Sequence, residues 1–160
     1  MIRVGQGYDV HRLVADRPLV LGGVAIEHDK GLAGHSDADV LIHSLCDALL
    51  GAAGKGDIGQ HFPDTDSSYR NIDSRILLRK VISLLKLDSW QLVNADLTVI
   101  AQAPKLAPHI AEMRRLLASD MNVEITQLNI KATTTEYLGF CGRQEGIAAL
   151  AIVLIENPLT

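Results

Sequence analysis

Two short stretches organise the 160-residue chain: Asp9-Val10-His11 and Gly34-His35-Ser36-Asp37-Ala38-Asp39-Val40-Leu41-Ile42-His43. Residues 2–11 have the pattern of a strand, in which alternate side chains share a face. Asp9 and His11 therefore point the same way, with Cα atoms about 6.6 Å apart. His43 falls in a predicted helix at 37–50, beside its apolar stripe rather than on it. Together the three side chains predict one metal site that joins the strand to the helix.

The predicted ligand set consists of two imidazoles and one carboxylate. Without a cysteine, this set suits Zn²⁺ in a catalytic site, where three protein groups bind and the fourth tetrahedral position stays open. The same set describes the facial triad of a non-haem Fe²⁺ enzyme. Such triads are typical of all-β barrels, whereas this sequence alternates strands with helices. The spacing alone leaves both metals open.

Composition limits the class of protein. A length of 160 residues fits one domain, 1–160, which buries roughly 68–70% of the surface of its unfolded form. The net charge is −4, basic residues are scattered, and aromatic residues are only 4% of the chain. A nucleic-acid binder needs a basic footprint and rings for base stacking, so we expect no nucleic-acid partner.

The two cysteines, Cys46 and Cys141, form no closely spaced pair. This pattern predicts reduced thiols and a cytoplasmic protein. The N-terminus lacks the apolar core of a signal peptide, and the longest late apolar run, 147–155, is far shorter than a membrane span. We therefore expect no membrane partner.

Hydrophobic periodicity and turn residues predict the remaining elements. Gly22-Gly23 marks a tight hairpin between arms at 18–21 and 24–26. Further strands are predicted at 92–100, 128–131 and 146–155, and further helices at 73–87 and 108–119. The strand–helix–strand unit from 92 to 131 implies a parallel pair of strands. The last strand is apolar enough to be buried on both faces.

Two segments read as loops. Residues 30–34 are punctuated by glycine and lead into the first helix, with Ser36 or Asp37 as its N-cap. Free N–H groups at that helix start also suit a phosphate. Residues 55–66 are too polar and too rich in Gly and Pro for a strand or a helix. Because a loop of this length is usually functional, its carboxylates are candidates for binding substrate hydroxyls.

A second group of polar residues follows the strand 128–131. Residues 133–136 supply three threonine hydroxyls and the Glu136 carboxylate, and Arg143 follows a glycine-containing turn. In isolation, consecutive threonines indicate only a preference for strands. At the carboxyl end of a strand, beside an arginine, they suggest contacts to phosphate oxygens, with Glu136 able to bind a divalent ion. No Walker loop is present.

The sequence resembles the 2-C-methyl-D-erythritol 2,4-cyclodiphosphate synthase family over essentially its whole length. Six motifs carry the resemblance: Asp9-Val10-His11, Gly34-His35-Ser36-Asp37-Ala38-Asp39, Gly56-Asp57-Ile58-Gly59, Phe62-Pro63-Asp64-Thr65-Asp66, Ala101-Gln102-Ala103-Pro104-Lys105 and Lys131-Ala132-Thr133-Thr134-Thr135-Glu136. Each motif is weak alone, and the six in the family's order are specific.

The resemblance implies a lyase that acts on 4-CDP-2-C-methyl-D-erythritol 2-phosphate in non-mevalonate isoprenoid biosynthesis. The 2-phosphate attacks the β-phosphorus of the diphosphate, CMP leaves, and a cyclic diphosphate remains. Since the substrate supplies both nucleophile and electrophile, the protein need only position it and neutralise charge. The alternative is a trimeric, metal-containing small-molecule-binding module without catalysis, which a fourth protein ligand on the metal would favour.

The resemblance also implies roles for individual residues. It assigns Asp9, His11 and His43 to Zn²⁺, and Glu136 to a second divalent cation, Mg²⁺ or Mn²⁺, on the substrate diphosphate. His35 and Thr134 would stabilise the transition state. The implied substrate-binding residues are Ser36, Asp57, Ile58, Gly59, Phe62, Pro63, Asp64, Thr65, Asp66, Ala101, Gln102, Ala103, Pro104, Lys105, Leu106, Ala107, Thr133, Thr135, Phe140 and Arg143.

The implied fold is α/β (α+β): a single domain with a mixed β-sheet covered by helices on one face, the sheets facing the axis of a homotrimer. Active sites would lie between neighbouring subunits. The apolar last strand agrees with this arrangement, because its second face would pack on partner subunits. The other expected partners are the nucleotide substrate and, transiently, further enzymes of the pathway.

Overall fold

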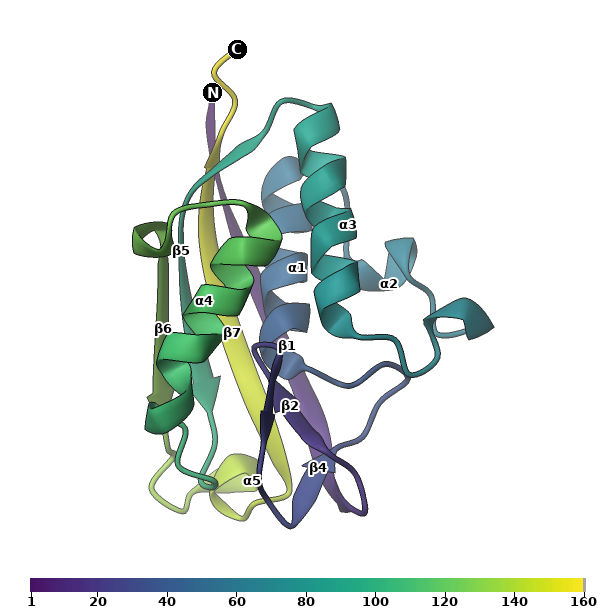
Figure 1. Cartoon of the computed structure of the whole chain (residues 1–160), viewed down its shortest axis with the longest axis vertical. Coiled ribbons are helices and arrows are strands. Elements are labelled where there is room, and N and C mark those ends of the chain that lie inside the picture. Colours follow the sequence, from purple (N-terminus) through teal and green to yellow (C-terminus); the bar gives the residue numbers. More distant parts are fainter. Residues whose placement is uncertain (160) are drawn as a thin grey trace.

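The computed structural model describes residues 1–159, so Thr160 of the predicted domain lies outside the described residues. Five strands form one mixed sheet in the order β4-β1-β7-β5-β6 (Figure 1). Their bounds are β1 Ile2–Ala15, β4 Lys30–Leu32, β5 Gln91–Ile100, β6 Leu128–Thr133 and β7 Gly146–Glu156. β5 and β6 run parallel, and the other neighbouring pairs run antiparallel. The predicted mixed sheet and its parallel crossover are confirmed.

Three long helices pack on one face of this sheet: α1 Val40–Ala53, α3 Ser74–Leu87 and α4 Ile110–Met121 (Figure 1). The smaller elements are the hairpin strands β2 Leu19–Leu21 and β3 Val24–Ile26, the short helices α2 Ile58–His61 and α5 Gly139–Gly142, and 3₁₀ turns at Ser67–Tyr69, Ala107–His109 and Ile125–Gln127. Among residues 1–159, no helix has the length and apolar character needed to cross a membrane.

The backbones of helix α1 and strand β1 lie in close contact. Gly5 and Gly7 occupy the β1 positions that face the helix. A Cβ at Gly5 would lie 2.0 Å from the carbonyl oxygen of Ala48, and a Cβ at Gly7 would lie 1.8 Å from that of Ser44. Because side chains alternate along a strand, Asp9 and His11 follow the two glycines on the same face. The close approach therefore brings the predicted ligands of β1 within reach of His43 on α1.

The opposite face of the sheet is only partly covered within one chain. Val4 is 68% exposed, Tyr8 51% and Ile152 54%, and Tyr8 pairs with Leu150 across the two longest strands. Leu150 and Leu154 are half-buried, whereas the alternate residues of β7 that face the helices are buried. The prediction that the last strand is buried on both faces is therefore wrong for the single chain.

The N-cap of α1 differs from the prediction of Ser36 or Asp37. The cap is Asp39, whose carboxylate accepts hydrogen bonds from the backbone N–H groups of Ile42 (3.1 Å), Gly22 (3.0 Å) and Gly23 (2.7 Å). Two of these donors belong to the turn of the β2–β3 hairpin, which is distant in sequence. The tertiary contact therefore selects Asp39 among three neighbouring residues of good capping type.

Both segments predicted to be loops contain short regular elements. Residues 30–32 form β4 because β1 continues to Ala15 and pairs with them at its end. Residues 58–61 form α2, with Asp57 as its N-cap. A four-residue helix shows too little hydrophobic periodicity to be recognised in the sequence.

Candidate functional site

Three predicted ligand side chains converge between β1 and α1. Asp9 Oδ2 lies 2.9 Å from His11 Nε2 and 3.1 Å from His43 Nδ1, and the two nitrogens are 3.2 Å apart. All three side chains are partly buried. Within residues 1–159, they form the single group of three or more His, Cys, Asp or Glu side chains placed to hold a metal ion, and no fourth ligand of these types joins it.

The donor chemistry of this group fits a divalent metal. His11 Nδ1 lies 2.8 Å from the carbonyl oxygen of Ala33, which can only accept, so Nδ1 carries the proton and Nε2 keeps its lone pair. Burial acts to raise the pKa of Asp9, but hydrogen bonds and charge attraction from His11 and His43 outweigh it and lower the pKa to about 2. The ligand set thus combines an ionised carboxylate with an imidazole nitrogen free to bind.

The Asp9 carboxylate has the opposite effect on its neighbour. Burial acts to lower the pKa of His11, but the hydrogen bond and charge of Asp9 outweigh it and raise this pKa. The centre therefore attracts positive charge, and a proton on His11 competes with a metal ion for the same position.

A cavity of about 270 Å³ opens beside the three ligands. Its lining residues are Asp9, His11, Gly34, His35, Ser36, His43, Ile58, Gly59, Phe62, Asp64, Tyr69, Ile72 and Leu77. Most of these come from the two segments that the sequence singled out, 34–43 and 55–66. Tyr69, Ile72 and Leu77 were not predicted to line a site, because Tyr69 and Ile72 lie in and after a 3₁₀ turn, Leu77 is on α3, and none of the three belongs to a motif.

A second recess, of about 480 Å³, adjoins this cavity at His35 and Asp64. Thr65, Arg17 and Arg70 also line it. Arg17 donates from Nη2 to the carbonyl oxygen of Ser36 at 2.8 Å, whereas its Nε is buried without a hydrogen-bond partner. Neither arginine was predicted, because a single basic residue outside a motif gives no signal.

Three other predicted residues of the 55–66 segment do not line the metal cavity. Asp57 accepts from the backbone N–H of Gln60 and caps α2. The carboxylate of Asp66 accepts from the backbone N–H of Ser68, and its carbonyl oxygen lies 3.2 Å from His35 Nε2. Pro63 likewise does not contribute to the cavity wall.

The remaining predicted residues form a separate group at the carboxyl ends of β5 and β6. The parallel strands end together, and Ala101 N–H donates to the carbonyl oxygen of Thr133 at 3.0 Å. Tyr137 N–H donates to Gln102 Oε1 at 2.9 Å, which ties the two loops to each other. The predicted members of this group are Ala101, Gln102, Ala103, Pro104, Lys105, Leu106, Ala107, Thr133, Thr134, Thr135, Glu136, Phe140 and Arg143. None of them lines the metal cavity of the same chain.

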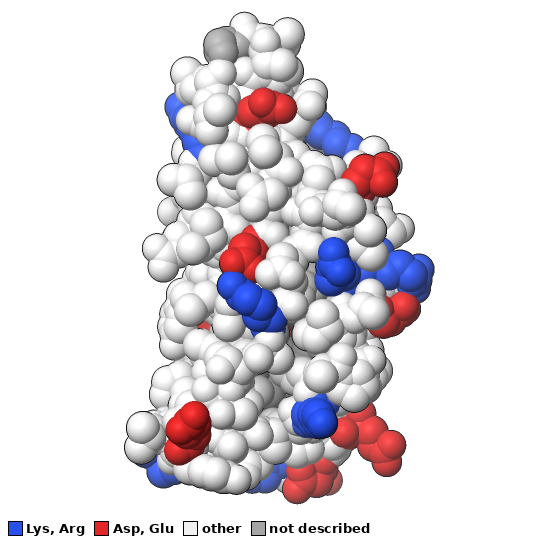
Figure 2. Space-filling view, turned by 90° about the vertical axis from the view of Figure 1, so that its left-hand side faces the viewer, with Lys and Arg blue, Asp and Glu red and all other residues white. Residues whose placement is uncertain are grey.

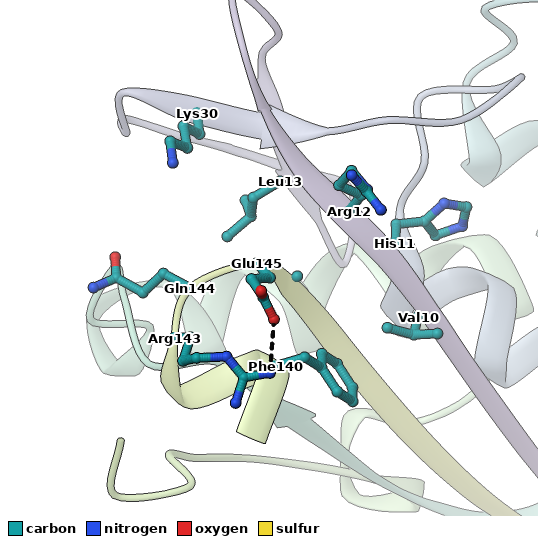
Figure 3. A pocket seen from close by; sticks show the side chains of 10 residues that line it. Val10, His11, Arg12, Leu13, Lys30, Phe140, Arg143, Gln144 and Glu145 are labelled. Atoms are coloured by element: carbon teal, nitrogen blue, oxygen red, sulfur yellow. Dashed lines mark hydrogen bonds and ion pairs between the residues drawn. The ribbon is translucent and has the colours of Figure 1, made fainter. Parts of the chain in front are cut away.

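Phe140 and Arg143 line a third cavity, of about 520 Å³, together with Val10 and Lys30 (Figure 3). Arg143 Nη2 forms an ion pair with Glu145 Oε2 at 3.0 Å, drawn as the dashed line in Figure 3. Residues from β1, β4 and the α5 region thus meet here. His11 also lines this cavity, so Phe140 and Arg143 share a cavity with one metal ligand of their own chain, whereas residues 101–107 and 133–136 line neither this cavity nor the metal cavity.

Comparison with known proteins gives one consistent family. The YgbB family matches residues 2–156. The chain is 64% identical over 156 residues to 2-C-methyl-D-erythritol 2,4-cyclodiphosphate synthase of Thiobacillus denitrificans, covering 98% of each chain. It is 58% identical over 157 residues to the protein of the same name in Geobacillus sp., covering 98% of this chain and 99% of that one.

Solved structures agree with the sequence relatives. The bifunctional IspDF from Campylobacter jejuni matches with a TM-score of 0.94 at 45% identity, over 98% of this chain and 42% of that one. The CDP complex of IspF from Plasmodium falciparum matches with a TM-score of 0.86 at 34% identity, over 98% and 96% of the two chains. The resemblance read from the six sequence motifs is thereby confirmed, and the chain belongs to the YgbB family.

Proposed function

We propose that the chain converts 4-CDP-2-C-methyl-D-erythritol 2-phosphate to 2-C-methyl-D-erythritol 2,4-cyclodiphosphate and CMP, as a phosphorus–oxygen lyase of isoprenoid biosynthesis. The observation that carries this proposal is the group of Asp9, His11 and His43 at the wall of a cavity, in a chain whose relatives bear this enzyme's name. In the reaction, a 2-phosphate oxygen bonds to the β-phosphorus, and the bond from that phosphorus to the oxygen of CMP breaks.

The metal centre suits Zn²⁺. Two imidazoles and one carboxylate, with no fourth ligand among the described residues, leave a tetrahedral position open. When bound there, zinc supplies Lewis-acid polarisation of a phosphate oxygen. The iron alternative is disfavoured by the mixed sheet with its helical layer, and the binding-module alternative gains no support from a three-ligand group.

The other residues of the metal cavity orient the substrate. His35, which lines both the cavity and the adjoining recess, would stabilise the transition state as charge develops on a phosphoryl oxygen. Asp64 and the segment from Ile58 to Phe62 would hold the methylerythritol hydroxyls. Ser36 is held nearby, since its hydroxyl accepts from the backbone N–H of Ala38 at 3.2 Å. These contacts position two groups of one molecule for in-line attack.

The second group of predicted residues would serve a neighbouring subunit. Ala101–Ala107 would bind the cytidine, and Thr134 would stabilise the transition state together with His35. Thr133, Thr135, Phe140 and Arg143 would contact the diphosphate region, and Glu136 would bind Mg²⁺ or Mn²⁺ there. The support for sharing is that residues 101–107 and 133–136 line neither the metal cavity nor the cavity beside His11 in their own chain.

A homotrimer with the sheets facing its axis would bring the two parts together. The support is the uncovered sheet face, where Val4, Tyr8 and Ile152 expose large apolar side chains around Gln6 on β1 and β7. Monomeric proteins rarely expose large apolar patches to water. In Figure 2, most of the visible surface is uncharged, and acidic and basic side chains are spread over it without a large patch of one sign.

The proposal has three further parts. The whole chain, 1–160, acts as a single catalytic domain. It works in the cytoplasm, which the buried free thiols of Cys46 and Cys141 support. Contacts with other enzymes of the pathway are transient.

The test is ³¹P NMR of the protein with 4-CDP-2-C-methyl-D-erythritol 2-phosphate and Mg²⁺. Three samples are compared: native, stripped with a chelator, and stripped then restored with Zn²⁺. We expect CMP and cyclic diphosphate signals that disappear on stripping and return with zinc. Absence of turnover in a folded, zinc-replete sample would refute the proposed reaction and favour the binding module.

A further inference from the structure

The imidazole of His43 is held from both sides. Its Nδ1 faces Asp9 and His11, and its Nε2 points away from them. Nε2 lies 3.0 Å from the hydroxyl oxygen of Ser74 and 3.1 Å from that of Ser36. The ring orientation of His43 therefore depends on which hydroxyl group fixes Nε2.

The Ser74 hydroxyl is held by a carboxylate behind it. Ser74 is the first residue of α3 and is fully buried. Its hydroxyl donates to Asp37 Oδ1, and its backbone N–H donates to Asp37 Oδ2 at 3.1 Å. Asp37 also accepts from the backbone N–H of Asp39 at 3.1 Å, so backbone groups on both sides hold the carboxylate. Asp37 therefore links the start of α3 to the segment leading into α1.

The proton count on Ser74 fixes the direction of the next hydrogen bond. A hydroxyl group has one hydrogen, and the Ser74 hydroxyl donates it to Asp37 Oδ1. The Ser74 oxygen is then left with its lone pairs, so it accepts from His43 Nε2–H. A protonated Nε2 places the free lone pair of the neutral ring on Nδ1, which faces Asp9 and His11.

We propose that Asp37 and Ser74 are positioning residues for the metal centre. The hydrogen bonds from His43 to Ser74 and from Ser74 to Asp37 keep His43 in its Nε2–H tautomer, with Nδ1 facing Asp9 and His11. Carboxylates behind metal-binding histidines play the same part in other proteins. This inference rests on the proposed zinc site and deepens it. It also gives Asp37 a role other than the helix cap that the sequence suggested.

Ser36 offers an internal comparison. Its hydroxyl oxygen lies 3.1 Å from Nε2, and it also accepts from the backbone N–H of Ala38, but no carboxylate is bonded to it. A hydroxyl polarised by a charged acceptor makes the stronger hydrogen bond. Removing the Ser74 oxygen should therefore weaken zinc binding more than removing the Ser36 oxygen.

The first experiment measures the zinc dissociation constant by competition with a chromophoric chelator. We expect Ser74→Ala to weaken zinc binding about 10- to 100-fold, and Ser36→Ala to weaken it less. Ser83→Ala is the matched control, because Ser83 lies on the same helix with its hydroxyl bonded to the Arg79 carbonyl. It should leave the constant unchanged.

Two further variants separate positioning from folding. Ser74→Thr keeps the hydroxyl and should retain more affinity than Ser74→Ala if both fold. Asp37→Asn keeps the side-chain volume but removes the charge, and should weaken zinc binding. The double variant, Asp37→Asn with Ser74→Ala, should bind zinc only slightly more weakly than Ser74→Ala alone. Additive losses in the double variant would contradict a single chain of hydrogen bonds.

The second experiment reads the tautomer directly, by long-range ¹H–¹⁵N NMR of the imidazoles in zinc-loaded protein. In the native protein we expect a slowly exchanging Nε2 proton on His43. This proton should exchange faster in Ser74→Ala, and at the native rate in Ser83→Ala. Failure of the native protein to bind zinc would overturn the zinc part of the proposed function. Native zinc binding with an unchanged constant in folded Ser74→Ala would overturn the positioning role alone.

Discussion

Gly7 lies so close to Ser44 that a Cβ on the glycine would be 1.8 Å from the serine carbonyl oxygen. No real contact is that short, and the obstacle is helix backbone rather than a flexible side chain. Any side chain at Gly7 would push α1 away from β1, and His43 would move with the helix away from Asp9 and His11.

We therefore expect Gly7→Ala to lower the free energy of unfolding by about 3 kcal/mol and to weaken metal binding. Urea titrations and a zinc competition assay measure the two effects. Gly51→Ala is the control, because a Cβ at Gly51 meets nothing within 4 Å and alanine favours a helix by up to about 1 kcal/mol. Equal unfolding midpoints for the two variants would contradict the packing argument.

The metal-free protein should be most stable at mildly acidic pH. The pKa of Asp9 is about 2 when folded, below its ordinary 3.8, so this group stabilises the fold above about pH 4 and ceases to do so as the pH falls toward 2. The pKa of His11 is raised, so its contribution is complete below 6.5 and is lost as the pH rises through the raised value.

The variant Asp9→Asn removes both contributions. We put the contribution of the Asp9 carboxylate to the free energy of unfolding at about 2 kcal/mol. Urea unfolding of chelator-treated protein from pH 3 to 8 should show a maximum between about pH 4 and 6.5 for the native chain, and a flatter profile for Asp9→Asn. Superimposable profiles would show that the cluster does not couple to folding.

A site divided between subunits can be tested by mixing two defects. His43→Ala damages the metal cavity, and Thr134→Val damages the second group of residues at the ends of β5 and β6. Oligomers formed by co-expression of the two variants would contain some sites with both parts intact, so we expect activity well above that of either variant alone.

The control pair for this experiment is His43→Ala with Asp64→Ala. Both changes lie in the metal cavity. If one chain supplies this whole cavity, every chain of a mixed oligomer carries one defect in its cavity. We expect no recovery from this pair. Absence of recovery in the first pair would mean that each chain completes its own site.

Lys80 should influence substrate binding without touching the metal. Its Nζ lies 5.1 Å from the centroid of Tyr69 and 5.9 Å from that of Phe62, and the two rings meet edge to face at 5.4 Å. Both rings line the metal cavity. Lys80→Met keeps the aliphatic stem and removes a cation–π contact worth about 0.5–1 kcal/mol.

We expect KM to rise about two- to fivefold in Lys80→Met with little change in kcat, because the chemistry does not involve this side chain. Steady-state kinetics provides the measurement. Lys86→Met, on the same helix, serves as the control and should behave as the native protein. A fall in kcat at constant KM would assign Lys80 a different role.

Patterns within a single element were sufficient for the ligands of the metal centre. Alternation along β1 placed Asp9 and His11 on one face, and the position of His43 beside an apolar stripe placed it at the edge of α1. The Gly22-Gly23 turn was equally clear, since both residues adopt positive φ, which glycine favours. In each case the deciding information lies within a few residues.

Features that depend on contacts between distant segments escaped prediction. Asp39 was not selected as the cap because the hairpin that supplies two of its donors lies elsewhere in the sequence. Tyr69 and Arg17 reach the cavities only through the path of their loops. The distance of Thr134 from the metal cavity likewise depends on the complete topology, which motif order does not contain.

The unbroken pairing of β1 with β7, from Ile2 opposite Glu156 to Arg12 opposite Gly146, has a consequence for natural variation. Substitutions on the uncovered face, such as at Val4, change one contact each. Deleting or inserting a single residue between Gly5 and Leu13 would exchange the two faces of every position beyond it. Among descendants of this gene, length changes should therefore be excluded from this segment, even at positions on the uncovered face where the amino acid varies.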